Sequence, residues 1–220
     1  VGSAAIAGGG QNAGPWYFLS RHVVFMSCGL ITALLVMRVE LKTVEKYSQW
    51  LLLGCFLVLA MVWLPFVGKS VNGARRWIYL GPAGFQAVEM VKVFYIIWLA
   101  SYLKRYNEDV AVKWYGMLKP AGVVVLLVGM LLIQPDFGSS VLLLGITACM
   151  LVLGGAPIKR LIAPVTVLLP ILAALVYFEP YRMRRVTSFM DPWQDQLGAG
   201  YQLSNALMAI GRGEWLGVGL

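Results

Sequence analysis

Histidine and cysteine are scarce in this chain: its 220 residues include one histidine, His22, and three cysteines. One histidine cannot build a metal site, and a Ser-His-Asp arrangement would need a nucleophile beside His22 that the sequence does not identify. The cysteines, Cys28, Cys55 and Cys149, all fall inside apolar segments, where a thiol behaves as a small hydrophobic group. A metal centre, a disulfide framework and triad hydrolysis are therefore disfavoured.

Charged residues are also few. They make up 13% of the chain and hydrophobic residues 60%, whereas soluble domains have roughly 25% charged residues. This balance indicates an integral membrane protein. Acidic residues number 10 against 18 Lys and Arg, which gives a net charge of +8. Because the basic residues stand at the ends of apolar runs and form no stripe on a soluble domain, membrane phosphates are a better counter-charge than nucleic acid.

Nucleotide-binding fingerprints are missing as well. The glycines near Gly68, Gly73, Gly81 and Gly84 match neither a P-loop nor a Rossmann spacing, which disfavours ATP-driven chemistry. No internal repeat is visible, which weakens the case for an inverted-repeat transporter. The first residues, VGSAAIAGGG, carry neither a starting methionine nor a signal-peptide pattern, so we expect further chain at both ends.

Long apolar runs dominate what is present. A helix needs about 20 mostly apolar residues to cross the hydrocarbon core. Pro164 and Pro170 interrupt the last run, which predicts kinks there. Only helices satisfy their own backbone groups in lipid without closing a barrel, so the expected fold class is all-α: a polytopic transmembrane helical bundle over residues 1–178, followed by a polar extracytoplasmic loop over residues 179–220. The six predicted spans are 17–37, 50–67, 85–103, 118–133, 138–153 and 161–178.

The distribution of basic residues nearly balances across the membrane. Nine Lys or Arg lie in the connections 38–46, 104–119 and 159–160, and eight lie on the opposite face. The positive-inside rule is therefore close to a tie. The first set is mixed with acidic residues in ordinary polar connections, whereas the second stands among Gly, Trp, Tyr and Pro. Binding an anion is the most economical reason for a basic cluster on the outer face, so we predict that the second face lies outside the cell membrane.

The segment 68–92, GKSVNGARRWIYLGPAGFQAVEMVK, is the first candidate site. Arg75 and Arg76 stand in what reads as an irregular Gly-rich loop, followed by aromatic residues that suit the bilayer interface. In the helix that follows, Gln86, Glu89 and Lys92 recur every three residues and so share one face. Lys92 lies about 10 Å inside the span, where a lone ammonium is costly and Glu89 can compensate it. Either a structural ion pair or the lining of a lipid-substrate cavity would explain this stripe.

Two further motifs carry polar residues. In QPDFGSS, residues 134–140, Pro135 ends one helix and Asp136 is placed to cap the next, although a contact with substrate or metal stays open. The stretch from 179 to 220 holds four arginines, and Arg184 with Arg185 could clamp a phosphate through their planar guanidinium groups. Within it, DPW at 191–193 predicts a turn, and residues 201–210 have helical apolar spacing. An ordinary basic loop on anionic lipid is the alternative.

These motifs resemble a known family. RRWIYLG with the following Q, E and K, QPDFGSS, and above all EPYRMRRVTSFMDPWQDQLGAGYQLSNALMAIGRGEWLGVGL are similar to the SEDS family of FtsW, RodA and SpoVE, the shape, elongation, division and sporulation proteins of bacteria. The segment PYRMRRVTSF is most similar to the corresponding segment of the cell-division members of this family. The resemblance covers essentially the whole chain. One departure is Ala87, where the family usually has proline after the glutamine.

The resemblance implies a protein of about ten helices, of which this chain holds the second to seventh, a remnant of the first and half of the loop after the seventh. The implied activity is that of an inverting peptidoglycan glycosyltransferase that polymerises lipid II, an undecaprenyl diphosphate-linked substrate. A class B penicillin-binding protein and other division proteins are the implied partners, at the septum in the bacterial inner membrane. The catalytic aspartate of the family is expected a short distance after Leu220.

Within this chain, the substrate-binding candidates are the outer-face arginines and the polar stripe: Arg75, Arg76, Arg184, Arg185, Gln86, Glu89 and Lys92. A divalent cation, magnesium or manganese, is a further candidate for stabilising the leaving group. Two alternatives from other classes stay open: a lipid II flippase, which would need a site open to each face in turn, and a non-catalytic division scaffold, which would need no cavity.

Overall fold

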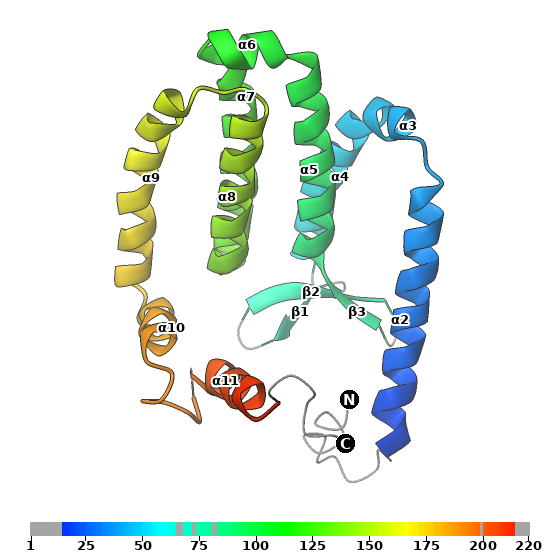
Figure 1. Cartoon of the computed structure of the whole chain (residues 1–220), viewed down its shortest axis with the longest axis vertical. Coiled ribbons are helices and arrows are strands. Elements are labelled where there is room, and N and C mark those ends of the chain that lie inside the picture. Colours follow the sequence, from blue (N-terminus) through cyan, green and yellow to red (C-terminus); the bar gives the residue numbers. More distant parts are fainter. Residues whose placement is uncertain (1–14, 65–67, 72–73, 81–82, 199, 214–220) are drawn as a thin grey trace. The chain divides into compact units, whose positions relative to one another are not determined.

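The structure, a computed structural model, describes residues 15–64, 68–71, 74–80, 83–198 and 200–213, most of them in helices (Figure 1). Contacts divide the chain into two compact units: Ala33–Ala163, and Val1–Thr32 together with Pro164–Leu220. The elements in chain order are α2 (Pro15–Met37), α3 (Leu41–Lys46), α4 (Ser48–Met61), β1 (Gly68–Val71), β2 (Ala74–Leu80), β3 (Ala83–Gln86), α5 (Ala87–Arg105), α6 (Asn107–Val112), α7 (Tyr115–Ile133), α8 (Phe137–Leu153), α9 (Ile158–Tyr177), α10 (Pro180–Met190) and α11 (Tyr201–Gly213).

Each of the six predicted spans forms a helix: α2, α4, α5, α7, α8 and α9. By length and composition, α7 and α9 could each cross a membrane, while α4, α8 and the His22–Met37 part of α2 are shorter apolar helices. α5 differs because Glu89, Lys92, Lys104 and Arg105 lie among its 19 residues. The prediction of an all-α, multi-span bundle is confirmed. α9 remains one helix with Pro164 and Pro170 inside it.

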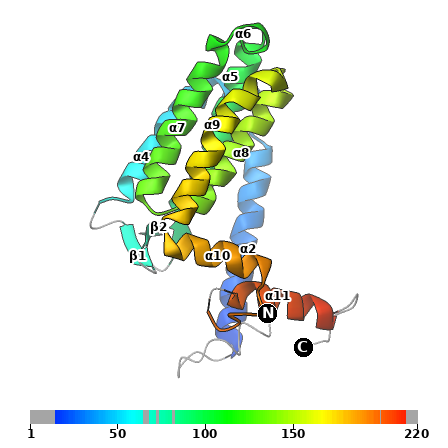
Figure 2. The same cartoon turned by 90° about the vertical axis from the view of Figure 1, so that its left-hand side faces the viewer.

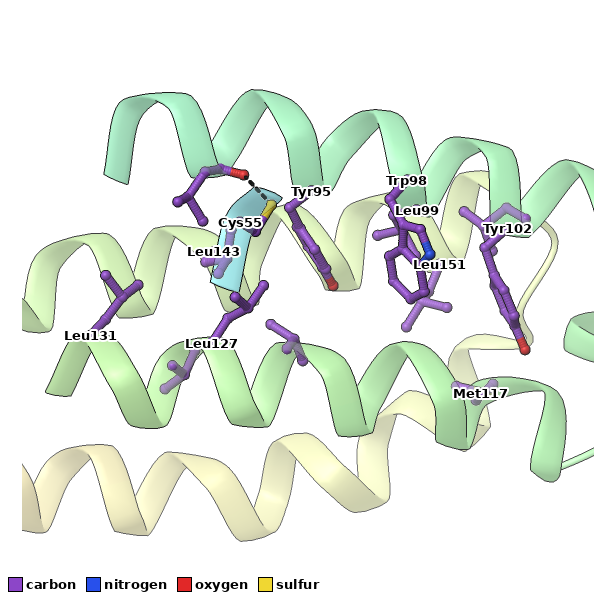
Figure 3. Close-up of a cluster of buried hydrophobic side chains, with 14 of the residues drawn as sticks. Cys55, Tyr95, Trp98, Leu99, Tyr102, Met117, Leu127, Leu131, Leu143 and Leu151 are labelled. Carbon is purple, nitrogen blue, oxygen red and sulfur yellow. Dashed lines mark hydrogen bonds between the residues drawn. The ribbon is translucent and has the colours of Figure 1, made fainter. Parts of the chain in front are cut away.

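Four helices build the core of the unit Ala33–Ala163. α5 packs against α4 and α8, and α7 packs against α8 and α4. Figure 3 shows Tyr95, Trp98 and Tyr102 projecting from one face of α5 into this cluster. Trp98 is 1% exposed, and its ring stacks on that of Tyr102 with 5.7 Å between centroids. One aromatic face of α5 therefore fills the space between these helices.

Buried hydrogen bonds tie the same helices together. The hydroxyl of Thr147 donates to the Leu143 carbonyl, so in the 2.9 Å contact between the Tyr95 and Thr147 hydroxyls the tyrosine is the donor. Water is absent from the hydrocarbon core, so such bonds are among the few polar interactions available between membrane helices. Further buried bonds between helices join Ser48 to Ser101, the Cys55 thiol to the Val91 carbonyl, Tyr102 to the Gly116 carbonyl, and Gln134 to the Leu59 carbonyl.

A small antiparallel sheet, ordered β1-β2-β3, precedes α5. We expected irregular loops here, and that expectation is wrong. Ile78 of β2 is buried against Val62 and Ala87, so the sheet packs onto the chain after α4 and the start of α5. A side chain at Gly68 would collide with the Val62 carbonyl, so only glycine permits this close approach. The sheet therefore fixes the backbone of the first candidate site.

The other end of this unit carries α3 and α6 (Figure 1) and ordinary ion pairs. Lys104 lies 2.6 Å from Glu45, and Lys113 lies 2.8 Å from Asp109. The hydrogen bond from Lys104 holds the pKa of Glu45 below its ordinary value. The stabilisation from this pair is therefore present at neutral pH and is lost as the pH falls through that lowered pKa. These contacts agree with the prediction of polar connections on this face.

Candidate functional site

The first candidate group lies where β3 meets α5. Gln86 ends β3 and occupies the N-cap position of α5, while Glu89 lies in the first turn of that helix. The Lys92 ammonium is 2.8 Å from a carboxylate oxygen of Glu89, so the predicted ion pair is confirmed. Its burial differs from the prediction, because the Lys92 side chain is 18% exposed but that of Glu89 is 61% exposed. The pair thus lies at the edge of the helical packing.

Arg75 and Arg76 belong to β2, and the Cα of Arg75 pairs with that of Ser70 on β1. Their side chains lie outside the described part of the structure, so their role stays a prediction. Trp77 pairs with Gln86 across β2 and β3, which brings the strand that carries both arginines beside the residue that begins the polar stripe. The sheet therefore joins, at the level of the backbone, two groups that the sequence suggested separately.

We predict that Glu89 and Lys92 are coupled and that the two single substitutions cost unequal amounts of stability. Glu89→Gln leaves a largely buried ammonium unpaired, whereas Lys92→Met leaves a carboxylate that is more than half exposed. The glutamine variant should therefore lower the free energy of unfolding more than the methionine variant does. Denaturant unfolding of the full-length protein in detergent should give a coupling of about 1 kcal/mol in the double-mutant cycle. Additive effects of the two substitutions would contradict the pairing.

The second candidate group lies on α10 and α11. α10 crosses the end of α9 at a steep angle, with α11 close by (Figure 2). The guanidinium of Arg182 donates to the Leu175 carbonyl in the last turn of α9 at 2.8 Å, which satisfies a helix-end carbonyl and fixes the corner. Arg182 therefore has a structural task. α10 itself begins with Pro180 at its first position, and proline there is a helix-start signal from which this helix could have been predicted.

A pocket of about 440 Å³ lies between α10 and α11. Arg185 lines it, and the guanidinium carbon of Arg185 lies 5.1 Å from the centre of the Tyr181 ring. Arg184 is not among its lining residues, because consecutive residues of a helix point in different directions. The predicted clamp of two adjacent arginines is therefore not formed at this pocket. The other lining residues, none of them among the predicted site residues, are Val186, Ser188, Phe189, Met190, Gln202 and Leu203.

The connection between α10 and α11 determines how these two helices enclose the pocket. The backbone N–H of Trp193 donates to the Asp191 carboxylate at 3.2 Å, which confirms the predicted DPW turn. Gly200 approaches this turn so closely that an added Cβ would lie 2.5 Å from the Pro192 carbonyl oxygen. The predicted helix over 201–210 is confirmed as α11. The pocket itself could not be predicted, because it depends on how this turn folds α11 back toward α10.

Asp136 caps α8, as the sequence predicted. Its carboxylate accepts from the Ser139 N–H at 3.4 Å, and the Ser140 hydroxyl donates to the Asp136 carbonyl at 2.8 Å. Within the described residues no group of three or more His, Cys, Asp or Glu side chains could hold a metal ion. The described residues therefore do not fit a protein-held magnesium or manganese site, and that ion stays a prediction.

Comparison with known proteins shows which family this chain is related to. The family model for cell cycle proteins of the FtsW, RodA and SpoVE type matches residues 2–220. A protein from Xanthomonas oryzae pv. oryzae named "Probable peptidoglycan glycosyltransferase FtsW" is 66% identical over 208 residues, covering 94% of this chain and 43% of that protein. A protein of the same name from Halorhodospira halophila is 44% identical over 221 residues, covering all of this chain and 56% of that protein. The chain thus spans about half the length of these relatives.

Solved structures give the same relationship. A chain from a structure described as "Structural coordination of polymerization and crosslinking by a peptidoglycan synthase complex" superimposes with a TM-score of 0.71 and 29% identity, covering 96% of this chain and 61% of that one. The rod shape determining protein RodA of Thermus thermophilus has a TM-score of 0.60 and 30% identity, covering 72% of this chain and 50% of that one. Sequence and fold agree, and this chain belongs to the FtsW, RodA and SpoVE family of cell cycle proteins.

Proposed function

We propose that the full-length protein is a peptidoglycan glycosyltransferase that polymerises lipid II during septal wall synthesis. The observation that carries this proposal is the 66% identity, over 94% of the chain, to a relative named as such an enzyme. The match extends across both candidate groups, since the family model matches residues 2–220. The bacterial inner membrane at the division septum is the proposed location, because the named relatives are FtsW proteins.

The proposed reaction is an inverting transfer between two lipid-linked sugars. The acceptor hydroxyl oxygen forms a bond to the anomeric carbon of the donor, a base removes the proton of that hydroxyl, and the bond from the anomeric carbon to the diphosphate breaks. The electron pair leaves with the polyprenyl diphosphate. No acidic residue of this chain is assigned as the base, because the family resemblance puts that aspartate after Leu220.

The part of this chain in the reaction is electrostatic. Negative charge grows on the departing diphosphate, and guanidinium groups held in advance near it stabilise the transition state. Arg185 has the best support for this role, since it lines the pocket between α10 and α11. Arg75, Arg76 and Arg184 stay candidates, and Gln86 with the Glu89–Lys92 pair is proposed to line the substrate cavity.

The proposed partner is a class B penicillin-binding protein that cross-links the new glycan. A chain of similar fold comes from a peptidoglycan synthase complex that coordinates polymerization and crosslinking, and this supports a partner of that kind. Lipid II and other division proteins complete the set of proposed partners.

We predict that β1 and the segment that contains α10 and α11 face the outside of the cell. The basic clusters at both places, which oppose the usual topology signal, motivate this prediction. Single cysteines at Ser70 and Gln194, in a variant without native cysteines, should both react with a membrane-impermeant maleimide on spheroplasts. Protection of either position until the membrane is opened would contradict the topology.

Polymerisation of purified lipid II tests the proposed function. The full-length protein with its penicillin-binding partner, whose transpeptidase is blocked by a β-lactam, should convert lipid II into glycan chains resolved by gel electrophoresis. The partner alone serves as the control. Transfer of lipid II across vesicle bilayers without chain formation would favour a flippase, and neither activity would favour a scaffold.

A further inference from the structure

The pocket between α10 and α11 is lined by both apolar and polar side chains. Val186, Phe189, Met190 and Leu203 supply hydrocarbon and aromatic surface, while Arg185 and Gln202 supply N–H donors. Ser188 adds little as a donor, because its hydroxyl already donates to the Arg184 carbonyl at 2.6 Å. A pocket of about 440 Å³ lies within the range of about 300 to 1,000 Å³ that small-ligand sites occupy. Such a lining suits an amphiphilic ligand with an anionic head group.

Arg185 is arranged to receive an oxyanion. Its guanidinium lies over the Tyr181 ring, one helical turn earlier on α10. A cation–π contact of this kind uses no N–H hydrogen bond of the guanidinium, so its N–H groups stay available for an acceptor. Phosphate oxygens accept such N–H groups in a bidentate manner, which favours phosphate over a neutral head group. The start of α11, where the helix dipole is positive, also lies at the pocket and adds to this preference.

The position of α10 indicates where such a ligand would come from. α9 is long and apolar enough to cross a membrane, and α10 begins three residues after its end. Arg182 holds this corner at the last turn of α9. Phe189 and Met190 are 76% and 82% exposed, and arginines beside exposed apolar side chains are typical of helices that lie in the bilayer interface. With α9 spanning the bilayer, a pocket this close to its end would open at the depth where the phosphates of membrane lipids lie.

We propose that the pocket between α10 and α11 binds the junction between phosphate and hydrocarbon chain of a lipid phosphate. Arg185 and Gln202 hold the phosphate, and Val186, Phe189, Met190 and Leu203 cover the first carbons of the chain. Two sources share this chemistry: a polyprenyl diphosphate, which is the lipid part of the proposed substrate, and an anionic glycerophospholipid. For the polyprenyl diphosphate the proposal rests on the proposed function and deepens it, because Arg185 is the residue proposed there to stabilise the departing diphosphate; binding of a glycerophospholipid would not depend on that function.

The test is photolabelling of the full-length protein in phosphatidylcholine nanodiscs with a polyprenyl diphosphate that carries a diazirine near its phosphate end. We expect the label on the peptides that contain Phe189 or Leu203. Arg185→Ala should lower the labelling about tenfold, because a charge-assisted contact is lost, and Arg185→Lys should retain part of it. Leu203→Ser should also lower it. Arg212→Ala also removes one arginine charge, but at a position about 15 Å beyond Gln202 along α11, so it should leave labelling unchanged.

Competition then identifies the source of the ligand. Displacement of the label by unlabelled polyprenyl diphosphate but not by phosphatidylglycerol would assign the pocket to the substrate lipid, and displacement by both would assign it to lipid phosphates in general. If inorganic diphosphate competes as well as the lipids do, the apolar lining residues do not contribute to binding, and that part of the proposal is overturned. Labelling elsewhere, or labelling of these peptides that Arg185→Ala leaves unchanged, would overturn the proposal. None of these results depends on polymerase activity.

Discussion

Arg185→Ala in the full-length protein is expected to slow glycan polymerisation by about 100-fold, in line with the loss of one preorganised donor to a developing anion. Arg185 lines the pocket between α10 and α11, where its guanidinium lies over the Tyr181 ring. Arg185→Lys should restore only part of the rate, because an ammonium is a point charge and cannot follow a diphosphate with two parallel N–H groups. The measurement is the initial rate of chain formation from lipid II with the partner's transpeptidase blocked.

Two comparisons make this result specific. Arg184→Ala should slow the reaction less than Arg185→Ala, since Arg184 does not line the pocket. Arg212→Ala, which removes a charge from the last turn of α11, should leave the rate unchanged. Co-purification of the penicillin-binding partner shows whether each variant still assembles. Normal polymerisation by Arg185→Ala would remove this residue from the mechanism.

Trp98→Ala is expected to lower the free energy of unfolding by about 3 to 5 kcal/mol. Trp98 is 1% exposed at the centre of the core of α4, α5, α7 and α8 and lies between Tyr95 and Tyr102, with ring centroids 5.9 and 5.7 Å away. Alanine would leave a cavity that these helices cannot close without breaking the buried hydrogen bonds of Tyr95 and Tyr102. Denaturant unfolding of the full-length protein in detergent measures the loss.

Trp98→Phe separates packing from polarity at the same position. Among the described residues, the indole N–H of Trp98 is one of two buried side-chain polar atoms without a hydrogen-bond partner. Phenylalanine removes this group and keeps an aromatic ring between the tyrosines, so it should cost less than half as much as alanine. Trp50→Ala is the control, since Trp50 is 69% exposed and should change the stability little. A Trp98→Phe loss equal to that of alanine would contradict this explanation.

The helical part of the fold was predictable because its signals are local. An apolar run of span length forms a helix in lipid whatever its neighbours are, so a helix is found at each of the six predicted spans, although only α7 and α9 are long and apolar enough to cross a membrane by themselves. The Glu89–Lys92 pair followed from a spacing of three residues, and the Asp136 cap and the DPW turn from short motifs. Each of these features is decided within a few residues of chain.

The sheet and the pocket were not predicted because their causes are spread along the chain. The Gly-rich composition of 68–86 suggested loops, although Asn72-Gly73 between β1 and β2 is a hairpin signal that could have revealed the first two strands. The sheet also depends on Ile78 being buried against Val62 and Ala87. At the pocket, Arg185 and not Arg184 is a lining residue. This depends on which face of α10 is turned toward α11, and no local sequence motif encodes that.

Release of polyprenyl diphosphate from lipid II tests the central claim most directly. A glycosyltransferase must free one lipid diphosphate for each glycosidic bond, whereas a flippase or a scaffold frees none. The full-length protein with its partner, the transpeptidase blocked, should release this lipid in step with chain growth, and the Arg185→Ala protein should release it about 100 times more slowly. Lipid II that crosses the bilayer or binds without any release of polyprenyl diphosphate would contradict the account.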